Sequence, residues 1–150
     1  MQISSILTPR RTQFKVPGDS KKRVLETLAK LIADDLPILN ADELFRRLIA
    51  RERLGSTGIG KGIAIPHCRI ENCVSTVGAL ITLDKPVDYD AIDGEPVDIV
   101  FAMLVPEEAH DEHLQTLASL AEMLSQPDYL ASLRSAGSDQ TLYNAAVSSL

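Results

Sequence analysis

The chain has 150 residues, 45% hydrophobic and 24% charged, and its 15 Lys and Arg against 21 Asp and Glu give a formal net charge of −6. This composition predicts one globular domain and excludes a disordered chain. The acidic balance, the absence of Trp and the 4% of aromatic residues argue against a nucleic-acid-binding protein. We expect no membrane-spanning helix and no secretion signal, and two cysteines are too few for a disulfide scaffold, so we expect a reducing cytoplasm.

The first half of the chain is expected to form one short strand and two helices. Polar and apolar residues alternate over residues 13–16, which predicts the strand. Ser20 and Asn40 are helix-capping residues, and each precedes a segment with apolar residues at helical spacing. These apolar positions are Val24, Leu25, Leu28, Leu31 and Ile32 in the first helix and Leu44, Phe45, Leu48 and Ile49 in the second.

The second half is expected to form strands followed by helices. Residues 62–65, 77–83 and 97–105 are predicted strands, and residues 85–96 between the last two are a polar connection. Helices are expected after Pro106, from Pro127 and after Ser138, the first with the apolar stripe Leu114, Leu117, Ala118, Ala121 and Leu124. Strands flanked by helices on either side in the sequence predict a small α/β sandwich.

A glycine-rich segment, Gly55–Gly62, matches the pattern of a nucleotide-binding loop except at Gly62, where that loop needs Ser or Thr. A predicted helix precedes the segment and a strand follows it, which is the reverse of the arrangement a nucleotide requires. Two interpretations stay open: a flexible connector, or a phosphate cradle in which Gly55, Ser56, Thr57 and Gly58 supply backbone N–H groups and hydroxyls.

Three histidines are candidate reactive groups. His67 follows a buried strand and Pro66, so its imidazole is expected at a stiff, exposed position, either as a nucleophile or as an ordinary surface histidine. His110 and His113 lie three residues apart at a predicted helix start, where they would either assist an anion site or shield the core. A zinc site built from these histidines with Cys68 and Cys73 is a rival that no ligand-spacing motif supports.

Two charged segments carry weaker signals. Asp88 to Asp93 in the polar connection breaks the pattern of a calcium loop, so we interpret it as a solvated connector. The cluster Lys21–Lys22–Arg23 lies at a helix start, where cations are disfavoured. It is either a solvated end or a site for acidic partners.

Three segments resemble the enzyme IIA components of the fructose–mannitol class of the bacterial phosphotransferase system: Arg51–His67, Asp90–Asp98 and His113–Leu117. The resemblance covers essentially the whole chain. We expect a free-standing domain that begins close to Ile3–Leu7 and has no partner domain after Leu150, and as such a domain it most resembles the nitrogen-regulatory branch. The resemblance implies one enzyme IIA type-2 domain over residues 1–150, with a single mixed sheet of about five strands flanked by helices on both faces, like other phosphotransferase/anion transport proteins.

The resemblance also implies roles for individual residues. His67 would accept the phosphoryl group on its outward (tele) nitrogen, His113 would assist without being phosphorylated, and Arg51 would face the phosphate. Helical periodicity alone does not choose between Arg51 and Arg53. Cys68 stands where relatives often have glycine, which bears on how freely the backbone beside His67 moves.

The implied activity is phosphoryl transfer between protein histidines in the cytoplasm, with no metal or other cofactor. The donor would be a histidine phosphocarrier protein, and the regulated partners would include potassium-transport or sensor-kinase proteins. Two alternatives remain open. The chain could be a sugar-specific enzyme IIA that passes phosphate to a permease IIB domain, or a binding module whose His67 no longer cycles.

Overall fold

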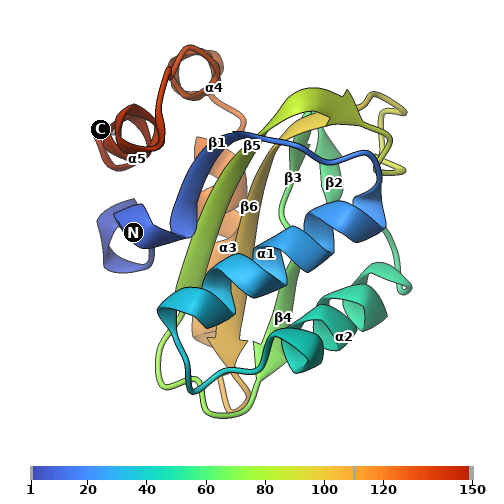
Figure 1. Ribbon diagram of the computed structural model, residues 1–150, viewed down its shortest axis with the longest axis vertical. Coiled ribbons are helices and arrows are strands. Elements are labelled where there is room, and N and C mark those ends of the chain that lie inside the picture. Colours follow the sequence, from blue (N-terminus) through green and yellow to red (C-terminus); the bar gives the residue numbers. More distant parts are fainter. Residues whose placement is uncertain (1, 110, 149–150) are drawn as a thin grey trace.

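A mixed β-sheet runs through the middle of the molecule, with helices on both of its faces (Figure 1). The computed structural model describes residues 2–109 and 111–148, and only the backbone of residues 111–113. Two short 3-10 helices, η1 (Ile3–Ser5) and η2 (Pro9–Arg11), begin the chain. The strands are β1 (Thr12–Val16), β2 (Gly58–Gly60), β3 (Ile63–Ala64), β4 (His67–Ile70), β5 (Val77–Val87) and β6 (Val97–Pro106). The longer helices are α1 (Lys21–Asp35), α2 (Ala41–Glu52), α3 (Asp111–Met123), α4 (Pro127–Arg134) and α5 (Asp139–Val147).

The strand order is β1-β5-β6-β3-β2, and β4 also pairs with β6. Strands β1 and β5 are parallel, β5 and β6 antiparallel, and β6 is parallel to both β3 and β4. Strands β3 and β4 lie along successive stretches of β6: Ile63 pairs with Ile99, and His67 pairs with Met103. The mixed sheet is therefore confirmed, with six strands where we expected about five.

Pro66 lies between β3 and β4, and because proline has no N–H to donate, the ladder is interrupted there. We predicted that His67 would follow the end of a strand over residues 62–65. That prediction was wrong in detail, because His67 is the first residue of a separate strand.

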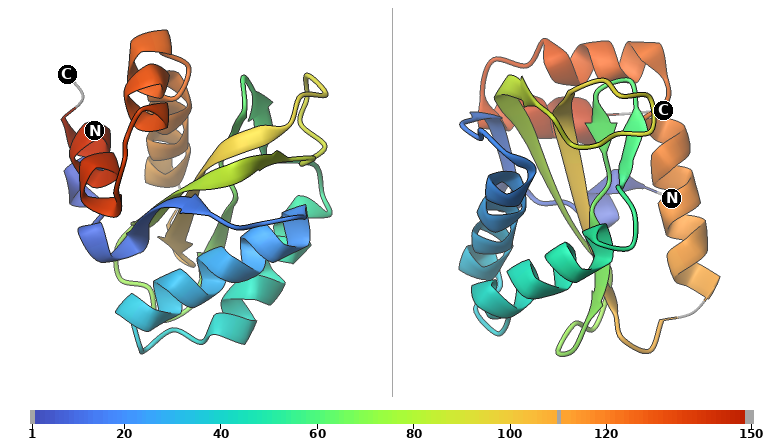
Figure 2. Two further views of the ribbon diagram at one scale, coloured as in Figure 1. Left: turned by 45° about the horizontal axis from the view of Figure 1, so that its top comes forward. Right: turned by 90° about the vertical axis from the view of Figure 1, so that its right-hand side faces the viewer.

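Each face of the sheet has its own apolar core. Along β6 successive side chains alternate between the two cores, with Val100, Ala102 and Leu104 on one face and Phe101, Met103 and Val105 on the other. Helices α1 and α2 cover the first face, whereas α3, α4 and α5 lie on the second (Figures 1 and 2). Among the described helices, none is long and apolar enough to cross a membrane.

The predicted helix starts are confirmed by their caps. The side chains of Ser20 and Asn40 accept hydrogen bonds from the backbone N–H groups of the residues three positions later, and Ser138 forms a capping box with Thr141. The predicted stripe of α3 was wrong at Leu114, which is 63% exposed, and at Ala118, which is also exposed, and it left out Leu120, which is buried. The polar connection also begins later than predicted, because β5 continues to Val87.

Gly78 in β5 provides a test of this packing. A Cβ atom at Gly78 would lie 2.8 Å from Cε1 of Phe101. We therefore expect Gly78→Ala to lower the free energy of unfolding by about 1–3 kcal/mol through overpacking, measured by urea denaturation. Gly137, where an added Cβ meets nothing within 4 Å, is the matched control. Equal effects of Gly78→Ala and Gly137→Ala would contradict this description of the core.

Candidate active site around His67

The strand pairing fixes the backbone on both sides of His67. The N–H of Met103 in β6 donates to the carbonyl of Pro66 at 2.9 Å, and His67 pairs with Met103. Cys68 and Ile70 point into the core beneath α1 and α2. The side chain of His67, the first residue of β4, is half-buried and lines a pocket together with residues of α2.

A backbone hydrogen bond defines the tautomer of the His67 ring. Nδ1 of His67 lies 2.9 Å from the carbonyl oxygen of Ile65. Because a carbonyl only accepts, we assign the proton to Nδ1, and Nε2 is then the basic nitrogen of the neutral ring. Nε2 is the atom that can act as a nucleophile.

The surroundings of His67 keep its ring neutral near pH 7. Burial is the main cause that lowers the pKa of His67, and the positive charge of Arg51 lowers it further. The hydrogen bond to Ile65 and the carboxylate of Glu52 act in the opposite direction, but the net shift is downward. The imidazole of His67 is therefore neutral near pH 7, with its proton on Nδ1.

Three arginines line the pocket at His67, which has a volume of about 350 Å³. Arg47 and Arg51 come from neighbouring positions on the last turns of α2, and Arg69 comes from β4. Arg51 donates from Nη1 to the carbonyl of Gly55 at 2.9 Å, and Arg47 donates from Nε to Glu43 at 3.0 Å. Three guanidinium groups beside a neutral imidazole make a site suited to an anion such as a phosphoryl group.

The structure distinguishes Arg51 from Arg53, which periodicity could not. Residues two positions apart on a helix point in different directions. Arg51 lines the His67 pocket, whereas Arg53 lines a second pocket between α1 and α2. Of the two, Arg51 is the one that shares a pocket with His67.

A buried carboxylate, Glu52, holds the start of the glycine-rich segment. Its side chain is 4% exposed and pairs with Nζ of Lys21 at 2.8 Å. Its oxygens accept from the backbone N–H of Thr57 at 3.1 Å and the hydroxyl of Tyr89 at 3.1 Å, and also from the Thr57 hydroxyl. The ammonium group of Lys21 lies 4.7 Å from the centre of the Tyr89 ring.

This cluster connects to His67 through the backbone. The carbonyl of Thr57 accepts from the N–H of Ile65 at 3.0 Å, and the carbonyl of Ile65 accepts from His67. Glu52, Thr57, Ile65 and His67 thus form a chain of hydrogen-bonded groups from α2 to the imidazole. Sequence reasoning missed Glu52, although its position four residues after Leu48 continues the apolar face of α2 and could have revealed it.

The predicted phosphate cradle is ordered by internal hydrogen bonds. The Ser56 hydroxyl donates to the carbonyl of Tyr89 at 2.8 Å and accepts from the N–H of Gly58 at 3.0 Å. The N–H and hydroxyl of Thr57 both bond to Glu52. These donors would have to exchange partners before they could hold a phosphate. The alternative of a flexible connector is wrong, because β2, which lies within Gly55–Gly62, pairs with β3.

The remaining candidate metal ligands are His110, His113, Cys68 and Cys73. His110 lies outside the described residues, and His113 is placed in α3 by its backbone alone, so the structure gives no geometry for either side chain. Cys68 is buried, which raises the pKa of its thiol to about 12 and keeps it protonated, and Cys73 donates to the carbonyl of Ser75. Within the described part of the chain, no three His, Cys, Asp or Glu side chains could hold a metal ion together.

The charged segments also have structural partners. Asp93 of the polar connection accepts from the backbone N–H groups of Lys61 and Glu95, each at 3.0 Å, so it closes this connection onto the glycine-rich segment. In the basic cluster, Lys21 is half-buried and pairs with Glu52, whereas Lys22 and Arg23 are exposed.

The sequence and the fold match one protein family throughout. The family described as "Phosphoenolpyruvate-dependent sugar phosphotransferase system, EIIA 2" matches residues 5–147. The chain is 52% identical over 147 residues to a nitrogen regulatory protein of Pseudomonas aeruginosa, covering 98% of this chain and 96% of that protein. It is 42% identical over 144 residues to a nitrogen regulatory protein of Escherichia coli, covering 95% and 88%. The crystal structure of nitrogen regulatory protein IIA-Ntr from Neisseria meningitidis superimposes with a TM-score of 0.88 at 38% identity, covering 96% of this chain and 98% of that one.

Glu52 provides a test of the buried cluster. Glu52→Ala removes the acceptor of a buried N–H and two hydroxyls, so we expect it to lower the free energy of unfolding by about 1–3 kcal/mol, measured by urea denaturation. Glu43, a residue of α2 whose ion pairs with Arg46 and Arg47 lie at the surface, is the control, and Glu43→Ala is expected to cost clearly less than Glu52→Ala. Equal costs for the two variants would contradict the role given to Glu52.

The pKa of His67 tests its electrostatic contact with Arg51. Arg51→Ala removes a positive charge that disfavours the imidazolium, so the pKa of His67 is expected to rise, as measured by NMR titration. Arg53→Ala, in the other pocket, is expected to leave it unchanged.

The same shift predicts a pH dependence of stability. Because the folded-state pKa of His67 is below about 6.5, its value in an unfolded chain, the unfolded state binds the proton first as the pH falls. The contribution of His67 to stability is therefore present above pH about 6.5 and lost as the pH falls through the folded-state pKa. A folded-state pKa of His67 above the unfolded value would contradict this.

Proposed function

The chain belongs to the phosphoenolpyruvate-dependent sugar phosphotransferase system EIIA 2 family, and on this premise we propose that it carries a phosphoryl group on Nε2 of His67. Members of this family are phosphoryl-transfer components. The observation that carries the proposal is the His67 ring itself: its Nδ1 is bonded to the Ile65 carbonyl, and it shares a pocket with three arginines. A histidine phosphocarrier protein in the cytoplasm is the proposed donor.

The proposed transfer exchanges one N–P bond for another. The electron pair of Nε2 attacks the phosphorus of the donor's phosphohistidine, and the bond between that phosphorus and the donor's ring breaks, so its electron pair returns to the donor. The ring of His67 becomes more positive as the new bond forms. The Ile65 carbonyl, which accepts from Nδ1, stabilises that charge. The energy of the transfer resides in the donor's phosphohistidine, so the step uses neither ATP nor a metal ion.

The protein is proposed to assist this transfer by positioning the reacting groups and by stabilising the charge of the phosphoryl group in the transition state. Arg51 is proposed to bind the phosphoryl oxygens with its guanidinium group, for which it would exchange its bond to Gly55. We also propose that His113 assists from α3, and that the Gly55–Gly58 backbone contributes N–H groups once its internal bonds exchange partners. The domain boundaries 1–150 are part of the same proposal, supported by the match to residues 5–147.

The phosphorylated and unphosphorylated forms are proposed to regulate different partners. By analogy with other phosphorylated side chains, the modification adds nearly two negative charges at pH 7. That charge would change which protein surfaces can lie against the His67 pocket. The regulatory role is supported by the relatives named nitrogen regulatory proteins, with which the chain aligns over nearly its full length.

Transfer from a labelled phosphocarrier protein tests the proposal. His67→Ala is expected to take up no label, and His113→Ala is expected to take it up more slowly than wild type. Arg51→Ala is expected to slow transfer by about 10²–10³-fold, the usual cost of losing a group that stabilises transition-state charge. Arg53→Ala, which removes the same side chain from the neighbouring pocket, is the matched control and is expected to transfer at close to the wild-type rate. Labelling of His67→Ala would overturn the proposal, and equal rates for the two arginine variants would remove Arg51 from it.

A further inference from the structure

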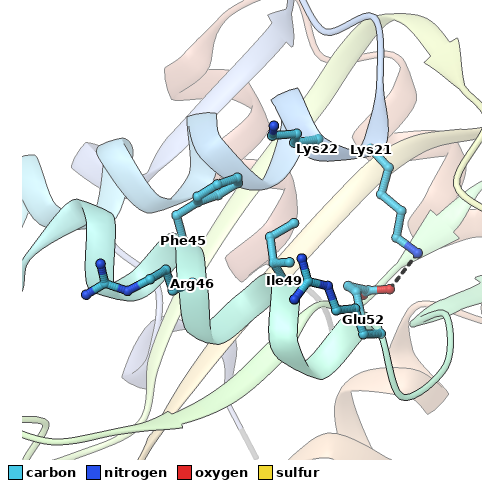
Figure 3. Close-up of a pocket in the computed structure, with 7 residues that line it drawn as sticks. Lys21, Lys22, Phe45, Arg46, Ile49 and Glu52 are labelled. Carbon is cyan, nitrogen blue, oxygen red and sulfur yellow. Dashed lines mark ion pairs between the residues drawn. The ribbon is translucent and has the colours of Figure 1, made fainter.

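A second, larger pocket opens between α1 and α2, with a volume of about 720 Å³. We call it the α1–α2 groove. Figure 3 shows Lys21 and Lys22 on the α1 side and Phe45, Arg46 and Ile49 on the α2 side. It shares no lining residue with the His67 pocket, so the phosphoryl-transfer proposal does not explain it.

The groove is positively charged in a protein whose formal net charge is −6. Four cationic side chains line it, of which Lys21 pairs with Glu52 at 2.8 Å and Arg46 pairs with Glu43 at 2.7 Å. Lys22 and Arg53 are exposed and form no ion pair with any described residue. The groove therefore offers cations that the protein does not neutralise itself, which favours a ligand of negative charge.

Apolar side chains lie between these cations. Phe45 and Ile49 are four residues apart on α2, so they share one face of the helix, and both are half-buried. They pack against the core beneath α1 and α2 and also line the groove. A ligand that covers them gains apolar contact as well as charge pairing.

The arrangement of the cations and the apolar side chains indicates the size of the ligand. Arg46, at one end of the groove, already pairs with Glu43 at 2.7 Å, so the unpaired cations are those at the other end. The Lys21–Glu52 ion pair joins the start of α1 to the end of α2, so Lys22 lies at the Arg53 end of the groove. Ile49 and Phe45 lie four and eight residues before Arg53, about 6 and 12 Å along the helix. A phosphate-sized anion at the two cations cannot also cover these apolar side chains, whereas an acidic peptide segment with an apolar residue can.

We propose that the α1–α2 groove binds an acidic segment of a partner protein. An apolar side chain of that segment lies against Phe45 and Ile49, and its carboxylates pair with Lys22 and Arg53. This is the helix-groove mode of peptide recognition, with charge added at the rim. The proposal depends on residues that the phosphoryl-transfer site does not use, so the two can fail separately.

Peptide display on the intact chain tests this proposal. Random twelve-residue peptides are selected on the wild-type protein, and the most enriched sequence is synthesised with a fluorescent label for polarisation measurements. We expect enriched peptides to be rich in Asp and Glu around at least one large apolar residue, and their binding to weaken as salt is raised. Selection that enriches no acidic peptide would overturn the proposal.

Charge-reversal variants locate the binding. Lys22→Glu/Arg53→Glu is expected to weaken binding of the labelled peptide at least tenfold. Lys15→Glu/Lys85→Glu changes the net charge equally at two exposed lysines outside the groove and is expected to have little effect. Thermal unfolding verifies that both double variants are folded. Equal loss in the two double variants, loss of binding in Arg51→Ala, or displacement of the peptide by inorganic phosphate at low millimolar concentration would each contradict the proposal.

Discussion

The hydrogen bond between Nδ1 of His67 and the carbonyl of Ile65 is the constraint on which the candidate site depends. It links a side chain to the backbone only two residues earlier, and it exists because Pro66 interrupts the sheet between them. A continuous strand would direct the Ile65 carbonyl into the ladder with its neighbour. With the interruption, that carbonyl holds the imidazole in one tautomer, and the other ring nitrogen, Nε2, is the one proposed to act as the nucleophile.

Glu52 supports this arrangement from α2. Its carboxylate fixes Thr57, and Thr57 in turn accepts from the N–H of Ile65. A carboxylate with a 4% exposed side chain is costly to bury unless it is well paired, and here Lys21, Tyr89 and Thr57 all contact it. The cluster thus joins both helices of one sheet face to the segment that precedes His67.

Local features of the sequence were predictable, and long-range ones were not. Capping residues act within one turn, so Ser20, Asn40 and Ser138 located three helix starts correctly. The separate strand β4 depends on pairing with β6, more than thirty residues later, and no local pattern encodes that pairing. Helical spacing from Leu48 indicates that Glu52 lies on the buried face of α2, but its partners Lys21 and Tyr89 are more than thirty residues away in the sequence, and no local pattern predicts them.

The central claim is that the fold presents Nε2 of His67, with Nδ1 protonated, to the phosphoryl donor. NMR of the nitrogen-15-labelled chain after phosphorylation by a histidine phosphocarrier protein tests it most directly, because the two isomers of phosphohistidine give different ring nitrogen and coupling patterns. We expect phosphorus on Nε2 and a proton retained on Nδ1. Phosphorus on Nδ1 would contradict it, because the hydrogen bond to Ile65 could not then exist.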